Sequence, residues 1–307
     1  MMGAMTAFDP VRADVSTGSS PFPWLVADGA FDPDLLATVV AEWPPLDDPR
    51  WKGYREAHEY RKLEGSDPAL WSPAATEVLG HLGAPATIRW VVEQLGLTDG
   101  DLVAQTVGGG YHTIERGGYL APHVDFNGHL VDGRWRRVNV LLFLVEDYDP
   151  AWGGKLQLGD PSCEVRLIEP RFGRLVAFET SSTSWHGHPD PWLGPVPRRS
   201  IAVYYFADSQ VPAHVEGHGT RWLSDEPARR EHERVAAELD AVRLEQHRLA
   251  AELDEARAAE NFARTAAAAH EARAEVLEHE LADLRSSTSW RITAPLRAVG
   301  AWRSRGR

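Results

Sequence analysis

The spacing of hydrophobic and polar residues divides the chain into parts with different periodicities. The first 20 residues are rich in Gly, Ser, Ala and Thr and have no periodic apolar face, so we expect a disordered leader over residues 1–20. From Phe22 to Trp43 the pattern predicts a short strand and then a helix, which Asp32 caps with Pro33 at its first position. Two further helices are expected at 74–82 and 86–95.

The middle of the chain changes to a period near two. Seven short apolar segments, separated by Gly, Pro, Asp and Asn, are typical of a β-sandwich or barrel rather than of alternating βαβ units. They are Val103–Val107, Gly118–Phe126, Arg137–Val145, Lys155–Leu158, Cys163–Ile168, Arg174–Glu179 and Arg199–Phe206. The fold class predicted is therefore α+β, with a jelly-roll core, N-terminal helices and a long C-terminal helix.

The periodicity becomes helical again after Pro227. Apolar residues recur at the first and fourth heptad positions from Val235 to Leu284, which predicts a coiled-coil helix over 225–285. A solvated single helix is the alternative. Residues 286–307 form an Arg-rich, amphipathic tail, for which weak contact with an anionic membrane surface and a solvated tail are both open.

Composition narrows the class of protein. The chain has 307 residues, 43% of them hydrophobic, and no apolar run approaches the roughly 18 residues that a membrane span needs. A net charge of −13 argues against nucleic-acid binding. The N-terminus does not have the pattern of a secretory signal, and the single cysteine, Cys163, cannot form an internal disulfide. We therefore expect a cytoplasmic protein.

Candidate chemistry centres on His123-Val124-Asp125. Side chains at i and i+2 of a strand face the same way, so His123 and Asp125 can reach one metal ion, with His186 as a third ligand from a neighbouring strand. Two histidines and one carboxylate leave coordination positions open, as in non-haem Fe(II) sites.

Alternatives to this metal site exist in the sequence. A hydrogen-bonded His123–Asp125 pair in a turn is the structural alternative. A second His-x-Asp occurs at His188 and Asp190, with His214 or His218 as a third partner, but the surrounding prolines predict a loop there.

Six segments in order resemble the 2-oxoglutarate and Fe(II)-dependent dioxygenases of the prolyl 4-hydroxylase-like type. The resemblance covers about 21–208 and includes His123-Val124-Asp125 and Trp185-His186-Gly187-His188. The segments are Gly117–Asp125, Arg136–Leu144, Gly153–Leu156, Pro170–Phe178, Ser184–Pro189 and Arg198–Phe206.

The resemblance implies a double-stranded β-helix within a dioxygenase domain at 21–222. His123, Asp125 and His186 would be the catalytic metal ligands, and His188 a loop histidine. The implied cofactors are Fe(II), 2-oxoglutarate and O2, with ascorbate as a candidate reductant. The implied reaction couples decarboxylation of 2-oxoglutarate to succinate with C–H hydroxylation of a peptide, small-molecule or glycan-linked substrate.

The same resemblance gives candidates for the 2-oxoglutarate pocket. Arg198 would bind the far carboxylate, while Arg199 faces the other way. Relatives often carry a tyrosine, whose hydroxyl binds that carboxylate, where this chain has Phe143. The candidates to replace this hydroxyl are Thr113, Tyr111, Asn139 and Ser200.

Two other functions remain open from the sequence. One is a cupin-like metal protein without oxygen chemistry, and the other is a non-catalytic coiled-coil scaffold. The stretch Ser289–Arg297 is similar to the ends of bacterial glycosyltransferases and other cell-surface polysaccharide enzymes. It suggests assembly beside such enzymes, through self-association or a partner protein, at the inner membrane face.

Overall fold

A computed structural model describes residues 7–98, 102–128, 133–161, 164–208, 217–223 and 226–293. The chain divides into two units, residues 1–239 and 240–307. Cys163, His214 and the last 14 residues of the basic tail, 294–307, lie outside the described residues.

The N-terminal elements follow the local signals of the sequence. Asp32 caps the first helix, its Oδ1 accepting a hydrogen bond from the amide of Asp34 at 3.0 Å, and Pro33 is the first helical residue as predicted. All three predicted helices are present, each beginning at a proline. The elements are β2 (Trp24–Asp28), α1 (Pro33–Ala41), α2 (Pro73–Leu82) and α3 (Pro85–Gln94), with a 3-10 turn at Pro68–Leu70.

The expectation of a disordered leader is wrong for part of residues 1–20. Strand β1 (Asp14–Gly18) pairs antiparallel with β2, from Asp14 opposite Asp28 to Gly18 opposite Trp24. Its side chains are mostly exposed, so the backbone ladder rather than an apolar face holds the strand. The pattern of hydrophobic residues in the sequence therefore gives no signal for strand β1.

Among the described residues, twelve strands form one curled antiparallel sheet. Its main order is β1-β2-β9-β6-β11-β5-β10-β7-β8, while β12 and β4 pair with β5, and β3 pairs with β4. This curled sheet with flanking helices is the predicted double-stranded β-helix. The remaining strands are β3 (Lys52–Arg55), β4 (Glu59–Gly65), β5 (Val103–Val124), β6 (Trp135–Phe143), β7 (Leu156–Leu158), β8 (Arg166–Ile168), β9 (Leu175–Glu179), β10 (His186–His188), β11 (Arg198–Ala207) and β12 (Arg221–Trp222).

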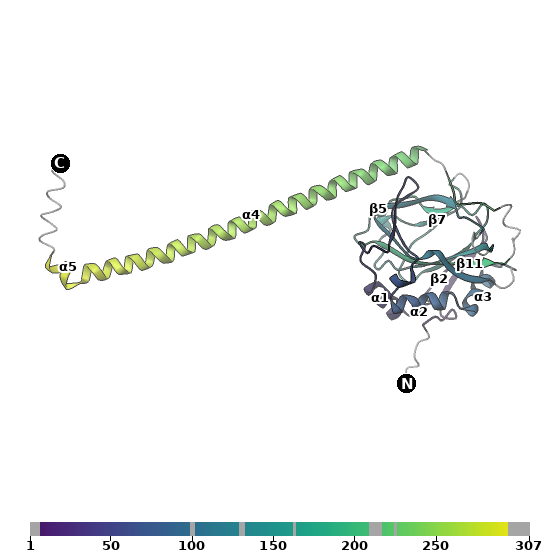
Figure 1. The fold of residues 1–307 in the computed structure, drawn as a ribbon, viewed down its shortest axis with the longest axis horizontal. Helices are drawn as coiled ribbons and strands as arrows, with labels where there is room; N and C mark the ends of the chain where they lie inside the picture. The colour runs from purple at the N-terminus through teal and green to yellow at the C-terminus, as the bar shows by residue number, and fades with distance from the viewer. Residues whose placement is uncertain are drawn as a thin grey trace, which may run out of the picture. The chain divides into compact units, whose positions relative to one another are not determined.

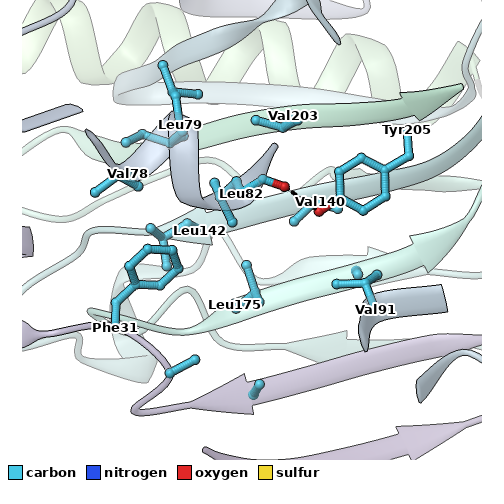
Figure 2. Close-up of a cluster of buried hydrophobic side chains, with 14 of the residues drawn as sticks. Phe31, Val78, Leu79, Leu82, Val91, Val140, Leu142, Leu175, Val203 and Tyr205 are labelled. Atoms are coloured by element: carbon cyan, nitrogen blue, oxygen red, sulfur yellow. Dashed lines mark hydrogen bonds between the residues drawn. The ribbon is translucent and has the colours of Figure 1, made fainter. Parts of the chain in front are cut away.

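The main hydrophobic core fills the space between the sheet and helices α1–α3, which gather at one face of it (Figure 1). Figure 2 shows Leu82 and Val91 from the helices beside Val140, Leu142 and Leu175 from the strands. The hydroxyl of Tyr205 donates a hydrogen bond to the carbonyl of Leu82 at 2.7 Å and joins the two layers. Burying this face fixes which strand residues point the other way.

The opposite face of the sheet surrounds a cavity. On β6, Val140 and Leu142 belong to the core, while Asn139, Leu141 and Phe143 line the cavity. The period of two along the strand thus assigns alternate residues to packing and to the site.

The β3–β4 hairpin has no counterpart among the predicted elements. Strand β4 pairs with β5, from Glu59 opposite Leu120 to Gly65 opposite Tyr111. Its sequence is rich in charged residues, two of which, Lys62 and Glu64, are buried at the cavity. The hairpin escapes sequence analysis because buried polar residues do not give an apolar alternation.

The C-terminal part is helical as predicted, with α4 over Glu226–Ser286 and α5 over Thr288–Ile292. Along α4 the apolar side chains of Val242, Leu249, Leu253 and Leu281 are exposed. None of the described helices combines the length and the apolar character that crossing a membrane requires.

Candidate active site

The paired strands β5 and β10 bring three candidate metal ligands together. His123 lies near the end of β5 directly opposite His186 of β10, and Asp125 follows the last residue of β5. One ligand atom from each residue lies within 4.8 Å of the others. The structure therefore assembles the three residues that the sequence singles out.

Hydrogen bonds orient both imidazole rings toward the carboxylate. His123 Nδ1 lies 2.9 Å from the carbonyl of Ala121, and His186 Nδ1 lies 3.0 Å from the carbonyl of Ser184. A carbonyl only accepts, so each Nδ1 carries the proton and each Nε2 presents a lone pair. These Nε2 atoms lie 3.4 Å and 3.3 Å from the carboxylate oxygens of Asp125.

Two side chains from β6 hold the Asp125 carboxylate. Arg136 Nη2 lies 2.9 Å from Asp125 Oδ2, and Asn139 Nδ2 donates a hydrogen bond to the same oxygen at 2.7 Å. Arg136 Nε also donates to Asn139 Oδ1 at 2.7 Å, so the two form one buried network. This arrangement fixes one carboxylate oxygen and stabilises the negative charge.

The electrostatics suit metal binding near neutral pH. Burial alone would raise the pKa of Asp125, but Arg136 and the neighbouring histidines outweigh it and hold that pKa well below its usual range. Burial, together with the proximity of His123, lowers the pKa of His186. A carboxylate and a neutral imidazole are the forms that bind metal ions.

The donor set fits an Fe(II) ion. Two imidazole nitrogens and one carboxylate on one side of a cavity leave further coordination positions for other ligands. Both Nδ1 atoms donate to backbone carbonyls, so each Nε2 can bind a metal ion without first losing a proton. His123, Asp125 and His186 would hold the ion.

Arg198 forms a cationic end to the same cavity. It opens strand β11, is 4% exposed, and donates from Nε to the carbonyl of Gly154 at 2.8 Å. Among the described residues, no carboxylate pairs with it, and burial lowers its pKa to about 10. A buried guanidinium without an anionic partner fits the far carboxylate of 2-oxoglutarate.

The neighbouring Arg199 takes the other face of β11, as strand alternation predicts. Its guanidinium carbon lies 5.7 Å from the ring centroid of Trp43, whereas that of Arg198 lies 4.8 Å from the ring of Phe143. Phe143 thus lines the cavity beside Arg198 without offering a polar atom.

The prediction that Thr113 binds the cosubstrate is wrong. Its side chain faces away from the cavity, and its Oγ1 accepts a hydrogen bond from Trp43 Nε1 at 3.0 Å. On β5, the neighbours His112 and Ile114 line the cavity, so alternation turns Thr113 toward the core. Tyr111 is excluded for the same reason, since its hydroxyl contacts Ser72.

Asn139 lines the cavity, but it contacts Asp125 rather than the cationic end. Its position beside a candidate metal ligand assigns it to orienting the carboxylate. Ser200, the remaining hydroxyl candidate, is buried and lines the cavity on β11.

The expectation that His188 is a loop histidine is also wrong. It is the last residue of β10, buried, and lines the cavity two residues after His186. The alternative triad of His188, Asp190 and His218 is not assembled. Within the described part of the chain, the only cluster of three or more His, Cys, Asp or Glu residues suited to a metal is His123, Asp125 and His186.

Two residues of the site gave no signal in the sequence. Arg136 is one arginine in a basic strand segment, and only the fold brings it to Asp125. Trp222 lies opposite His123 on β12, with its ring centroid 4.9 Å from the imidazole. Neither forms a spacing motif with the ligands.

Fold and site together define a class: a double-stranded β-helix with three clustered candidate metal ligands and a buried arginine lining one cavity. Comparison of the sequence with family models agrees, since residues 109–206 match the 2OG-Fe(II) oxygenase superfamily. The match includes all three candidate ligands and Arg198. The chain therefore contains a 2OG-Fe(II) oxygenase domain and is a 2-oxoglutarate-dependent dioxygenase that uses Fe(II) and O2.

Similar solved structures include several hydroxylases. A prolyl-4-hydroxylase from Pseudomonas putida is 20% identical, covering 60% of this chain and 92% of that one, with a TM-score of 0.45. A prolyl hydroxylase from Trichoplax adhaerens, in complex with a hypoxia inducible factor peptide fragment, is 17% identical over 60% and 84%, with a TM-score of 0.44. HygX from Streptomyces hygroscopicus, with nickel and 2-oxoglutarate, is 14% identical over 66% and 93%, with a TM-score of 0.43. Among curated proteins, none matches the sequence significantly.

Proposed function

We propose that this dioxygenase hydroxylates a C–H bond of a polar, hydroxyl- or amino-bearing substrate, either a small molecule or a glycan-linked group. The observation that carries the proposal is a set of buried charged and hydrogen-bonding side chains facing the same cavity as His123, Asp125 and His186. The cavity has a volume of about 580 Å³, within the usual range of small-molecule sites.

The polar wall comes from the β3–β4 hairpin. Tyr54 donates a hydrogen bond to Glu64 Oε2 at 2.7 Å, and Lys62 Nζ lies 3.0 Å from Glu59 Oε1. With Lys52 beside them, two ammonium groups balance two carboxylates. A wall with donors, acceptors and no excess charge suits a neutral polar or zwitterionic group better than an apolar ring.

Aromatic and imidazole groups complete this side of the cavity. Trp222 packs between His58, at a ring-centroid distance of 4.9 Å, and His123, at the same distance. His112 Nε2 lies 3.0 Å from the carbonyl of Gly108, which also accepts from the hydroxyl of Tyr204 at 2.8 Å. These contacts hold the polar wall in place and present a flat aromatic ring beside one candidate ligand.

Different residues of the cavity would have different roles in the reaction. His123, Asp125 and His186 would hold the iron, Arg136 and Asn139 fix the carboxylate ligand, and the β3–β4 wall would orient the substrate. When bound, Fe(II) with 2-oxoglutarate supplies the oxidising chemistry that couples succinate formation to hydroxylation. His123 and His186 are each 5% exposed, which limits the contact of these two side chains with bulk water.

A substrate screen tests the proposal. Polyols, amino sugars and proline-containing peptides would be incubated with protein, Fe(II) and 2-oxoglutarate, and succinate would be measured with the mass of each product. We expect a polyol or amino sugar to stimulate succinate release and to gain one oxygen atom. Glu64→Gln should weaken that stimulation while leaving the affinity for 2-oxoglutarate unchanged. Turnover of proline peptides alone would contradict the proposal.

We further propose that α4 pairs with a second copy of itself. Leu249 and Leu253, each 50% exposed, and Leu281 at 43% lie at the predicted heptad core positions. The flanking positions mix both charge signs, as in the ion pairs of Arg248 with Glu245 and Glu252. Two copies would therefore meet without strong repulsion.

A further inference from the structure

We propose that His188 is a second binding residue for the far carboxylate of 2-oxoglutarate, acting beside Arg198. The imidazole is only 3% exposed, and its Nδ1 is buried without a hydrogen-bond partner. An unpaired buried donor or acceptor is costly, and a ligand that pairs with it removes that cost. The proposal concerns the cosubstrate and does not depend on the substrate class proposed above.

Strand register places His188 and Arg198 at the same end of the cavity. In the β10–β7 pair, His186 lies opposite Leu158 and Gly187 opposite Gln157, so antiparallel continuation brings His188 alongside Leu156. Two residues before Leu156, the carbonyl of Gly154 accepts the hydrogen bond from Arg198 Nε. His188, Leu156 and Arg198 all line the cavity.

The spacing along β10 matches the length of the cosubstrate. His186 and His188 lie two residues apart on one strand, hence on the same face with a rise of about 6.6 Å. An extended five-carbon dicarboxylate has its two acid groups separated by a comparable length. If its keto-acid end lies at the iron beside His186, its far carboxylate reaches the level of His188.

His188 also supplies a hydrogen-bond donor, which Phe143 at the same end of the cavity does not have. The Phe143 ring packs against the Arg198 guanidinium at 4.8 Å and has no polar atom. An imidazole N–H can donate a charge-assisted hydrogen bond to a carboxylate that Arg198 already attracts. The pair would thus recognise the carboxylate by charge from one side and by a directed hydrogen bond from the other.

The test compares two keto acids that differ only at this end. Calorimetry on the anaerobic Fe(II)-loaded protein would measure the affinity for 2-oxoglutarate and for 2-oxopentanoate, which has no far carboxylate. We expect His188→Ala to weaken 2-oxoglutarate binding by about tenfold or more and to leave 2-oxopentanoate binding unchanged. His81→Ala, on the exposed side of α2, is the matched control and should change neither affinity.

His188→Asn preserves a polar side chain, and the same two affinities can be measured on it if the alanine variant does not fold. We expect the asparagine variant to lose less of the preference for 2-oxoglutarate than the alanine variant does. Equal weakening of both keto acids would assign His188 to structure alone and overturn the proposal. Unchanged binding of 2-oxoglutarate, or a wild-type protein that does not prefer it over 2-oxopentanoate, would overturn it as well.

Discussion

Asn139 Nδ2 donates a hydrogen bond to Asp125 Oδ2 at 2.7 Å, and the same nitrogen lies 3.5 Å from His186 Nε2. One amide on β6 thus contacts two candidate metal ligands that come from different places along the chain. The contact explains why an asparagine interrupts the apolar residues of β6 at this point.

Asn139→Ala should weaken metal binding without unfolding the protein. Removing a group that orients a ligand typically reduces metal affinity by about 10- to 100-fold. Competition with a chelator measures that affinity for Fe(II), or for Mn(II) as a stable substitute. An affinity equal to that of the wild type would show that Arg136 alone is sufficient to fix the carboxylate.

Thr113→Val should affect stability and leave the cosubstrate pocket unchanged. The substitution leaves the buried Nε1 of Trp43 without its acceptor, which costs about 1–3 kcal/mol of the free energy of unfolding. Urea unfolding measures this loss, and calorimetry should give an unchanged affinity for 2-oxoglutarate. A large loss of that affinity would restore Thr113 as a pocket residue.

The free energy of unfolding of the metal-free protein should decrease as the pH is lowered from about 6.5 to about 4, because His112 stays neutral in the folded protein over this range. Burial, helped by the charge of Lys62 and opposed by Glu64, lowers the pKa of His112 from 6.5 to about 4. Between these values the unfolded chain binds a proton that the folded chain does not. The free energy of unfolding therefore decreases as the pH falls, by at most about 1.4 kcal/mol per pH unit for this group.

Comparison with His112→Gln isolates that contribution. The variant has no imidazole at this position, so its unfolding free energy, measured in urea across the same pH range, should fall less steeply than that of the wild type. Parallel pH profiles would mean that His112 titrates normally in the folded protein.

Ending the chain after Leu239 should abolish the proposed pairing through α4 and leave cofactor binding intact. The first unit, residues 1–239, contains every residue of the active site, while the exposed apolar positions from Val242 onward lie in the second. We expect unchanged Fe(II) and 2-oxoglutarate binding, and sedimentation equilibrium should give a dimer for the full chain and a monomer for the shortened chain. Equal oligomeric states for the full and shortened chains would contradict pairing through α4.

The pairing of His123 with Asp125 could be predicted from sequence because its signal is local, whereas His186 and Arg198 are assigned by their match to family motifs. The i, i+2 spacing puts Asp125, the residue after β5, on the same side as His123, and strand alternation shows that Arg198 and Arg199 point to opposite faces of β11. The helix beginning at Pro33 also follows from a local cap. Such features need no knowledge of how distant segments meet.

Other parts of the site depend on contacts between distant segments. Arg136 reaches Asp125, Trp222 reaches His123, and buried charged residues of β4 line the cavity. His188 was misassigned because the prolines after it predict a loop, whereas pairing with β5 and β7 extends the strand through it. Long-range pairing overrides the local signal at these places.

The metal centre is tested most directly by an anaerobic titration of the metal-free protein with Fe(II) and then with 2-oxoglutarate, in which the visible charge-transfer absorption of the protein is measured. We predict one iron per chain and an absorption band that requires both additions in the wild type. His123→Ala and Asp125→Ala should abolish the band, and Arg198→Ala should shift its appearance to much higher 2-oxoglutarate concentrations. A band of wild-type intensity in the His123→Ala and Asp125→Ala variants would contradict the assigned metal centre.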